Sequence, residues 1–167
     1  MEKFEELRDI SKKKIQIADH ILTQTYPLIQ DAKLLLVVLE NLFLALTNSL
    51  GSLLYYERAL KTIPPFQDNF SSKFNMFKEK CAQKYNFSRE QIIFIQDIKD
   101  IIIQHKKSPV EFTRKDSFVI CSDNYNMEII SIDKIKGYLS KAKLFIHEID
   151  KIVSSNKELF ANKAILK

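Results

Sequence analysis

The sequence predicts an all-α protein, an up-and-down bundle of four to five helices with one long central helix. A short β-hairpin, at about residues 117–130, is expected before the last helix. Two observations carry this prediction. Long stretches place apolar side chains at helical spacing, and the 167 residues include only 2 glycines and 4 prolines. Glycine supplies the positive φ angles of phosphate loops and tight hairpins, so Walker loops, dinucleotide folds and most strand-rich folds are excluded.

The first predicted helix covers residues 2–25, where apolar side chains recur on one face. Proline disfavours helical backbone in the residue before it, so Tyr26-Pro27 is expected to interrupt this helix. A second helix is expected from Asp31, a good N-cap residue, to about Lys61, before two consecutive prolines. With roughly 30 residues it would be about 45 Å long and would form the centre of the bundle.

The third segment, residues 70–85, carries an aromatic stripe at helical spacing: Phe70, Phe74, Phe77, Cys81 and Tyr85. Core packing is the expected role of this stripe, and stacking on nucleic-acid bases is the alternative. A capping box follows, with Ser88 at the N-cap and Gln91 three residues later. It begins a helix that runs to His105.

Residues 106–116 lose the helical period and are expected to form a loop. The runs 117–121 and 127–130 then predict one hairpin, and Ser131 caps the last helix. The chain is expected to form a single domain over residues 1–155, followed by a frayed or disordered tail over residues 156–167.

Charge and cysteine content limit the classes of function. The net charge is +5, which allows anionic partners without requiring them. Cys81 and Cys121 have no CxxC partner, so we expect reduced thiols in a cytoplasmic protein. The apolar run Leu34–Leu46 is too short to span a membrane, and we expect no membrane association. No ligand pattern indicates a metal site, and no cofactor is expected.

Small and polar residues form one line on the long helix: Asn41, Ala45, Asn48, Ser52 and Tyr55, with Gly51 beside them. Such a line is typical of helices whose backbones approach closely and share hydrogen bonds. The alternative is a shallow polar groove for a ligand or partner, formed by Asn41, Asn48, Ser52 and Tyr55.

His105 is the histidine whose position in the sequence is compatible with a catalytic role. It follows core-facing isoleucines at a helix end, just before a basic loop. Positive neighbours would favour a neutral histidine able to act as a base, and they would also hold a phosphate. The candidate nucleic-acid contacts are Lys106, Lys107, Arg114 and Lys115. The alternative is a histidine that only caps its helix.

A long-helix bundle in which a helix ends in a histidine, before a basic loop and a closing helix, resembles the HEPN superfamily. The resemblance implies a helical domain associated with RNA, and in many members a metal-independent ribonuclease. The family motif is an arginine, four to six residues and then a histidine. His105 matches the histidine, whereas Lys99 stands where the arginine would be. Arg114 is the other candidate cation. Lysine lacks the planar fork that binds phosphate through two hydrogen bonds.

Three hypotheses for the function follow. A non-catalytic helical interaction protein, binding RNA or a protein partner through a basic side around residues 99–115, ranks first because no complete catalytic set is present. A HEPN-like ribonuclease that uses His105 is the second. A structural homo-oligomer is the third, because the central helix is apolar on more sides than a small monomer easily covers; a homodimer is its simplest form.

Overall fold

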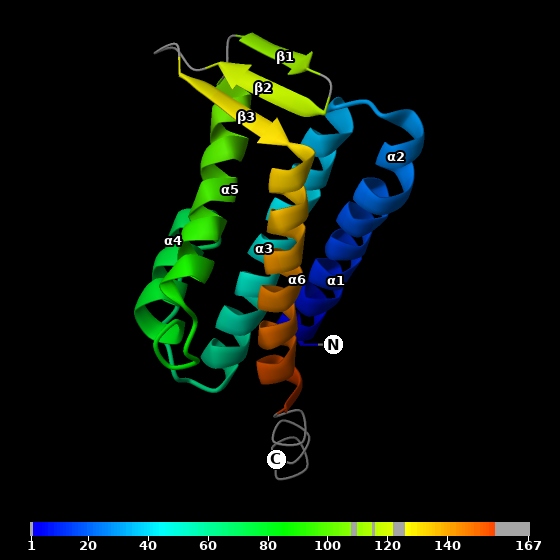
Figure 1. The fold of residues 1–167 in the computed structure, drawn as a ribbon. Helices are drawn as coiled ribbons and strands as arrows, with labels where there is room; N and C mark the ends of the chain where they lie inside the picture. The colour runs from blue at the N-terminus through cyan, green and yellow to red at the C-terminus, as the bar shows by residue number, and fades with distance from the viewer. Residues whose placement is uncertain (1, 108–109, 115, 122–125, 156–167) are drawn as a thin grey trace.

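The structure, a computed structural model, describes residues 2–107, 110–114, 116–121 and 126–155. It confirms the predicted all-α class, with a small sheet at one end of a helical bundle (Figure 1). The elements in chain order are α1 (Lys3–His20), the π-helical turn η1 (Ile21–Thr25), α2 (Tyr26–Ile29), α3 (Lys33–Ala59), α4 (Phe70–Met76), the π-helical turn η2 (Phe77–Cys81), α5 (Arg89–Lys107), β1 (Val110–Arg114), β2 (Ser117–Cys121), β3 (Met127–Ser131) and α6 (Ile132–Ser155). The expected tail over residues 156–167 lies outside the described residues.

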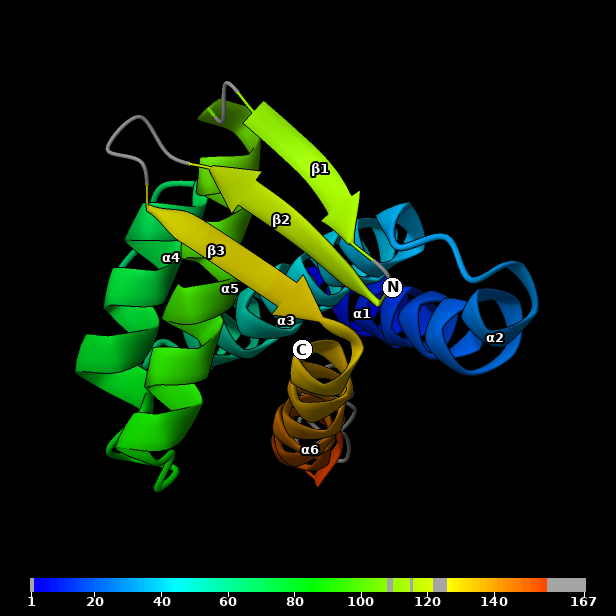
Figure 2. The ribbon, with the colours of Figure 1, turned by 45° about the horizontal axis from the view of Figure 1, so that its top comes forward.

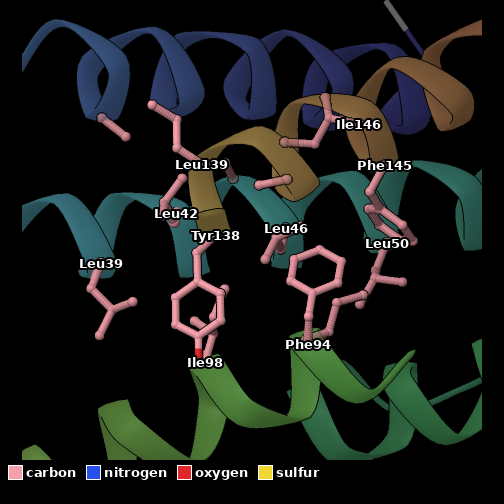
Figure 3. Close-up of a cluster of buried hydrophobic side chains, with 14 of the residues drawn as sticks. Leu39, Leu42, Leu46, Leu50, Phe94, Ile98, Tyr138, Leu139, Phe145 and Ile146 are labelled. Carbon is pink, nitrogen blue, oxygen red and sulfur yellow. The ribbon is translucent and has the colours of Figure 1, made fainter. Parts of the chain in front are cut away.

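The central helix of the bundle is α3, as the sequence predicts. It packs against α1, α4, α5 and α6, so its apolar side chains are buried on several sides. Figure 3 shows the part of the core where α3, α5 and α6 meet, formed by Leu39, Leu42, Leu46, Leu50, Phe94, Ile98, Tyr138, Leu139, Phe145 and Ile146. The aromatic stripe of the third segment also joins the core, because Phe74 and Phe77 are buried.

By length and composition, α3 is the one helix within the described chain that could cross a membrane. The core helix of a soluble protein meets the same criterion, and 56% of the most apolar window of α3 is buried inside the protein.

The expected interruption at Tyr26-Pro27 is wrong, because the first helix continues through Pro27 to Ile29. The turn before the proline is π-helical, and the Tyr26 N–H donates to the Ile21 carbonyl five residues earlier. A widened turn shifts the carbonyls that a proline ring would meet in an α-helix. The chain reverses instead at Gln30, which has a positive φ of 55°.

The predicted hairpin is present as β2 and β3, which pair antiparallel with Val119 opposite Ile129. The expected loop over residues 106–116 is wrong for residues 110–114, which form β1 on the other side of β2 (Figure 2). Phe118, Ile120 and Ile130 are buried, and the sheet closes one end of the bundle. The structure therefore adds a strand where the sequence shows mixed charged and β-branched residues.

Two predicted helix caps are confirmed. The Gln91 N–H donates to Ser88 Oγ at 3.1 Å, and the Ser88 N–H donates to Gln91 Oε1 at 2.8 Å, which completes the capping box of α5. At the start of α6 the Lys134 N–H donates to Ser131 Oγ at 3.2 Å. These caps fix where α5 and α6 begin.

Candidate functional site

His105 lies where the end of α5 meets α3 and β1. Its Nδ1 is 2.6 Å from Glu111 Oε1 in β1, and its Nε2 is 3.8 Å from Glu40 Oε1 in α3. The ring also meets Phe118 edge-on, with 6.4 Å between the ring centroids. The expected positive neighbours are therefore replaced by two carboxylates, and His105 connects three elements of the fold.

Neither candidate cation is brought to His105. Lys99 faces α4, where its Nζ lies 4.8 Å from the centroid of the Phe70 ring and 3.4 Å from Ser71 Oγ. Arg114 is at the far end of β1, three residues and about 10 Å along the strand from Glu111. The pair that a HEPN-like nuclease would need, a histidine with a cation beside it, is therefore not formed by His105 with Lys99 or Arg114.

The predicted nucleic-acid contacts are spread over the sheet end of the bundle. Lys106 and Lys107 are exposed in the last turn of α5, and Arg114 is exposed at the far end of β1. Glu111 lies between these two places in the chain. Lys115 lies outside the described residues.

The polar line on α3 lies along its contact with α1. Ser52 Oγ donates to the Phe4 carbonyl of α1 at 2.7 Å, and Ser11 Oγ of α1 donates to the Ala45 carbonyl at 2.7 Å. Gly51 is so close to α1 that an added Cβ would lie 3.1 Å from Leu7 Cδ1. Serines and glycine thus allow the two helices to approach closely.

The other members of this line are occupied within the chain. The side-chain amides of Asn41 and Asn48 donate to carbonyls four residues earlier in α3, at 2.9 and 2.7 Å. The Tyr55 ring packs edge-on against Phe66, with 5.1 Å between their centroids.

Two neighbouring hollows between α5 and α6, which share no lining residue, form a feature that the sequence analysis did not predict. Its α5 wall follows one helical line, Glu90, Phe94, Asp97, Ile101 and Gln104, which spans about 20 Å. Its α6 wall carries Lys134, Tyr138, Lys141, Leu144 and Glu148. We call this feature the α5–α6 groove. It contains two hollows of about 380 and 370 Å³.

The hollow farther from the sheet, which we call the lower hollow, is bridged by side chains that reach from one helix to the other. Gln91 Nε2 donates to Glu148 Oε2 at 2.9 Å, and Lys141 Nζ lies 3.4 Å from Glu90 Oε1. Each carboxylate in this half therefore has a partner on the opposite helix. Leu144 stands at the edge of this half and is 56% exposed.

The upper hollow, nearer the sheet, differs because its carboxylates are not joined across the two helices. It is lined by Asp97, Asp100, Ile101, Gln104, Glu128, Lys134 and Tyr138, and we call it the upper pocket. Asp100 accepts a hydrogen bond from Gln96 of its own helix at 2.8 Å. Glu128 in β3 pairs with Lys134 in α6. Asp97 makes no hydrogen bond or ion pair with any residue that the structure describes.

Tyr138 forms the floor of the upper pocket and is only 9% exposed. Burial, together with the nearby Asp97 and Glu128 carboxylates, raises the pKa of Tyr138 to about 12. The hydroxyl therefore keeps its proton at neutral pH and offers both a donor and an acceptor to the pocket.

Protein-family models, curated proteins and solved structures were compared with the chain, and none matches. Within the described residues, no group of three or more His, Cys, Asp or Glu side chains is placed to hold a metal ion.

A second polar cluster is buried near the end of α3. Glu57 is 1% exposed and accepts hydrogen bonds from Thr62, Tyr85 and Lys84, the last at 2.9 Å. Burial alone would raise the pKa of the Glu57 carboxyl, but these donors together hold that pKa below its usual value. Burial also raises the pKa of the neighbouring Cys81 thiol to about 12, so this free cysteine is unreactive. The cluster joins the end of α3 to the segment after α4.

The sequence does contain a signal for the groove. Positions 90, 94, 97, 101 and 104 share one helical face and mix charged with apolar residues, and positions 134, 138, 141 and 148 do the same in α6. A mixed line of this kind indicates a face at the border between core and solvent.

Proposed function

We propose that this protein is a non-catalytic interaction module whose α5–α6 groove binds a positively charged segment of a partner protein. The observation that carries the proposal is the charge of the groove. Among its described lining residues, five carboxylates face two lysines, although the whole chain has a net charge of +5. A local excess of negative charge on a basic protein attracts cationic partners and repels nucleic acid.

The shape of the groove also suits lysine and arginine side chains. Phe94 and Ile101 line the groove but are only 2% and 3% exposed, so Leu144, 56% exposed at its edge, supplies most of the accessible apolar surface among these three. Lysine and arginine lay their aliphatic stems along such surface while their charged ends reach carboxylates. The line of α5 residues that borders both hollows is about 20 Å long, which matches about six residues of an extended peptide.

A protein partner is favoured over RNA because the described cations that were predicted to contact nucleic acid are not gathered into one surface. Lys106 and Lys107 lie at one end of β1 and Arg114 at the other, whereas Lys99 is packed on Phe70. Binding of a phosphate backbone needs several cations along one track.

The test is a comparison of three fluorescein-labelled probes: hexalysine, hexaglutamate and a single-stranded RNA of 12 nucleotides. Fluorescence anisotropy at low salt should show binding of hexalysine alone, and added salt should weaken it. The double variant Asp97→Asn/Glu128→Gln should bind hexalysine roughly ten-fold more weakly, because a partly exposed ion pair contributes up to about 1 kcal/mol.

The matched control is the double variant Glu6→Gln/Glu79→Gln, which changes the net charge equally at exposed positions outside the groove. We expect it to bind hexalysine like the wild type. Equal losses in both variants would mean that only overall charge matters, and binding of the RNA probe in preference to hexalysine would overturn the proposal.

A further inference from the structure

We infer that the upper pocket is a recognition site for an organic cation that carries N–H donors, an alkylammonium or a guanidinium group. We further infer that Lys134 is an internal cation that competes with this ligand for Glu128. The inference rests on the proposed function in that the ligand group belongs to the partner's lysine or arginine, but the pocket can be tested without the partner.

The hydroxyl of Tyr138 is the first group of the upper pocket that a ligand could contact. The residue is 9% exposed, yet its hydroxyl makes no hydrogen bond with any residue that the structure describes. Figure 3 shows the side chain reaching from α6 toward α5, with the oxygen at the α5 side. Within the described residues the one fully buried side-chain polar atom without a hydrogen-bond partner is Arg8 Nε, so the Tyr138 oxygen is accessible from the hollow of about 370 Å³ and can bond a ligand there.

The charges around this hydroxyl define the ligand. Asp97 and Glu128 lie near Tyr138, and Asp100 adds a third carboxylate to the pocket. Carboxylates only accept hydrogen bonds, and a phenol oxygen also accepts one. A ligand that satisfies them together must carry positive charge and several N–H groups, as ammonium and guanidinium groups do.

Lys134 already supplies one such cation from within the chain. Its Nζ pairs with Glu128, while its backbone N–H is held by Ser131 at the start of α6. The lysine lies one helical turn before Tyr138, so its charge is close to the site. The Lys134 ammonium neutralises the charge of Glu128, so the Asp97 carboxylate is the one that a ligand would contact. Removal of the Lys134 charge should therefore strengthen ligand binding.

The first experiment titrates the ¹⁵N-labelled protein with n-butylammonium at low salt and follows amide chemical shifts. The shifts should centre on residues 97–104 and 128–138. Tetramethylammonium has the same charge but no N–H donor, and it should bind at least about five-fold more weakly. Equal binding of the two cations, or shifts centred elsewhere, would overturn the inference.

Two variants separate ligand binding from folding. Tyr138→Phe should weaken n-butylammonium binding several-fold and leave the free energy of unfolding unchanged or higher, because the hydroxyl bonds no described residue whose hydrogen bond would be lost. Lys134→Gln should strengthen n-butylammonium binding several-fold, a gain that unfolding cannot produce. The control Lys136→Gln, an exposed lysine two residues further along α6, should bind like the wild type. Unchanged binding in both Tyr138→Phe and Lys134→Gln would contradict the inference.

A final set of ligands shows whether the bound cation comes from a protein side chain or from a free amine, and it tests the two proposals separately. N-acetyl-lysine amide represents a lysine side chain, and spermidine represents a free polyamine. If n-butylammonium and hexalysine both bind in the upper pocket, the inference and the proposed function both stand. Binding of n-butylammonium and spermidine without hexalysine would keep the pocket and overturn the proposed function. Binding of hexalysine without any shift from the small amines would overturn the inference alone.

Discussion

At the scale of single residues, Glu57 shows how one buried carboxylate joins separate segments. Its donors come from the end of α3 and from the turn after η2, and the ammonium of Lys84 is only half-buried. An acceptor that serves several donors is costly to remove, because each donor is left without a partner. The cluster is therefore expected to be important for stability.

Glu57→Ala should lower the free energy of unfolding by about 2–4 kcal/mol, and Lys84→Ala by less, since the lysine is half exposed. Urea unfolding at pH 7 measures both. A value for Glu57→Ala within about 0.5 kcal/mol of the wild type would contradict the role of the cluster.

The pH dependence of stability has a definite sign at Glu57. Its pKa is lower in the folded protein than its ordinary value of 4.5, so ionised Glu57 stabilises the fold above that pH. This contribution is lost as the pH falls from 4.5 through the folded pKa. The wild type should thus lose stability toward acid more steeply than Glu57→Gln, as urea unfolding at several pH values would show.

His105→Ala should destabilise the protein by about 1–2 kcal/mol, because the ring loses Glu111 and its packing on Phe118. In EDTA, we expect the wild type and the variant to behave alike on single-stranded RNA. Cleavage by the wild type that disappears in His105→Ala would favour the HEPN-like nuclease and contradict a structural role for His105.

At the scale of elements, the two glycines occupy different environments in helices. An added Cβ at Gly137 would have no atom within 4 Å, whereas one at Gly51 would lie 3.1 Å from Leu7 Cδ1. Gly137→Ala should therefore stabilise α6 by about 0.5–1 kcal/mol, the usual gain in a helix interior. Gly51→Ala should gain less because Leu7 must move. Thermal unfolding compares the two, and destabilisation by Gly137→Ala would show that α6 needs its glycine.

The elements that could be predicted from sequence are those governed by local chemistry. Ser88 and Gln91 specify the start of α5 through a capping box, and Ser131 specifies the start of α6. The two errors depend on wider context. A π-helical turn lets the helix pass Pro27. The strand β1 is only five residues long and lies in a basic segment, and it becomes a strand through its pairing with β2.

At the scale of the whole molecule, α3 explains both the fold and the dimer hypothesis. Most of its apolar side chains are covered within one chain by α1, α4, α5 and α6, whereas Val37 and Leu44 stay exposed. A homodimer stays a prediction from the sequence. Light scattering at micromolar concentration tests it, and a mass of 19.6 kDa would exclude the dimer.

The α5–α6 groove belongs to this scale as well, which is why sequence reasoning missed it. The helical lines of Asp97 and Tyr138 indicate border positions, but the space between the helices depends on how α5 and α6 pack on α3. Gln91 and Lys141 bridge the two helices in the lower half, whereas the carboxylate of Asp97 in the upper half has no partner among the described residues. The spacing of residues in one helix does not reveal the distance to another.

The most direct measurement of groove binding is site-directed photo-crosslinking to labelled hexalysine. One variant carries p-benzoylphenylalanine in place of Leu144 at the edge of the groove, and the matched control carries it in place of Leu44 on α3. The two leucines are similarly exposed, 56% and 43%, and Leu44 does not line the groove. We expect crosslinks from position 144, clearly fewer of them with Asp97→Asn/Glu128→Gln at a hexalysine concentration below saturation, and none above background from position 44. Equal crosslinking from both positions, or crosslinks from position 44 alone, would contradict binding in the groove.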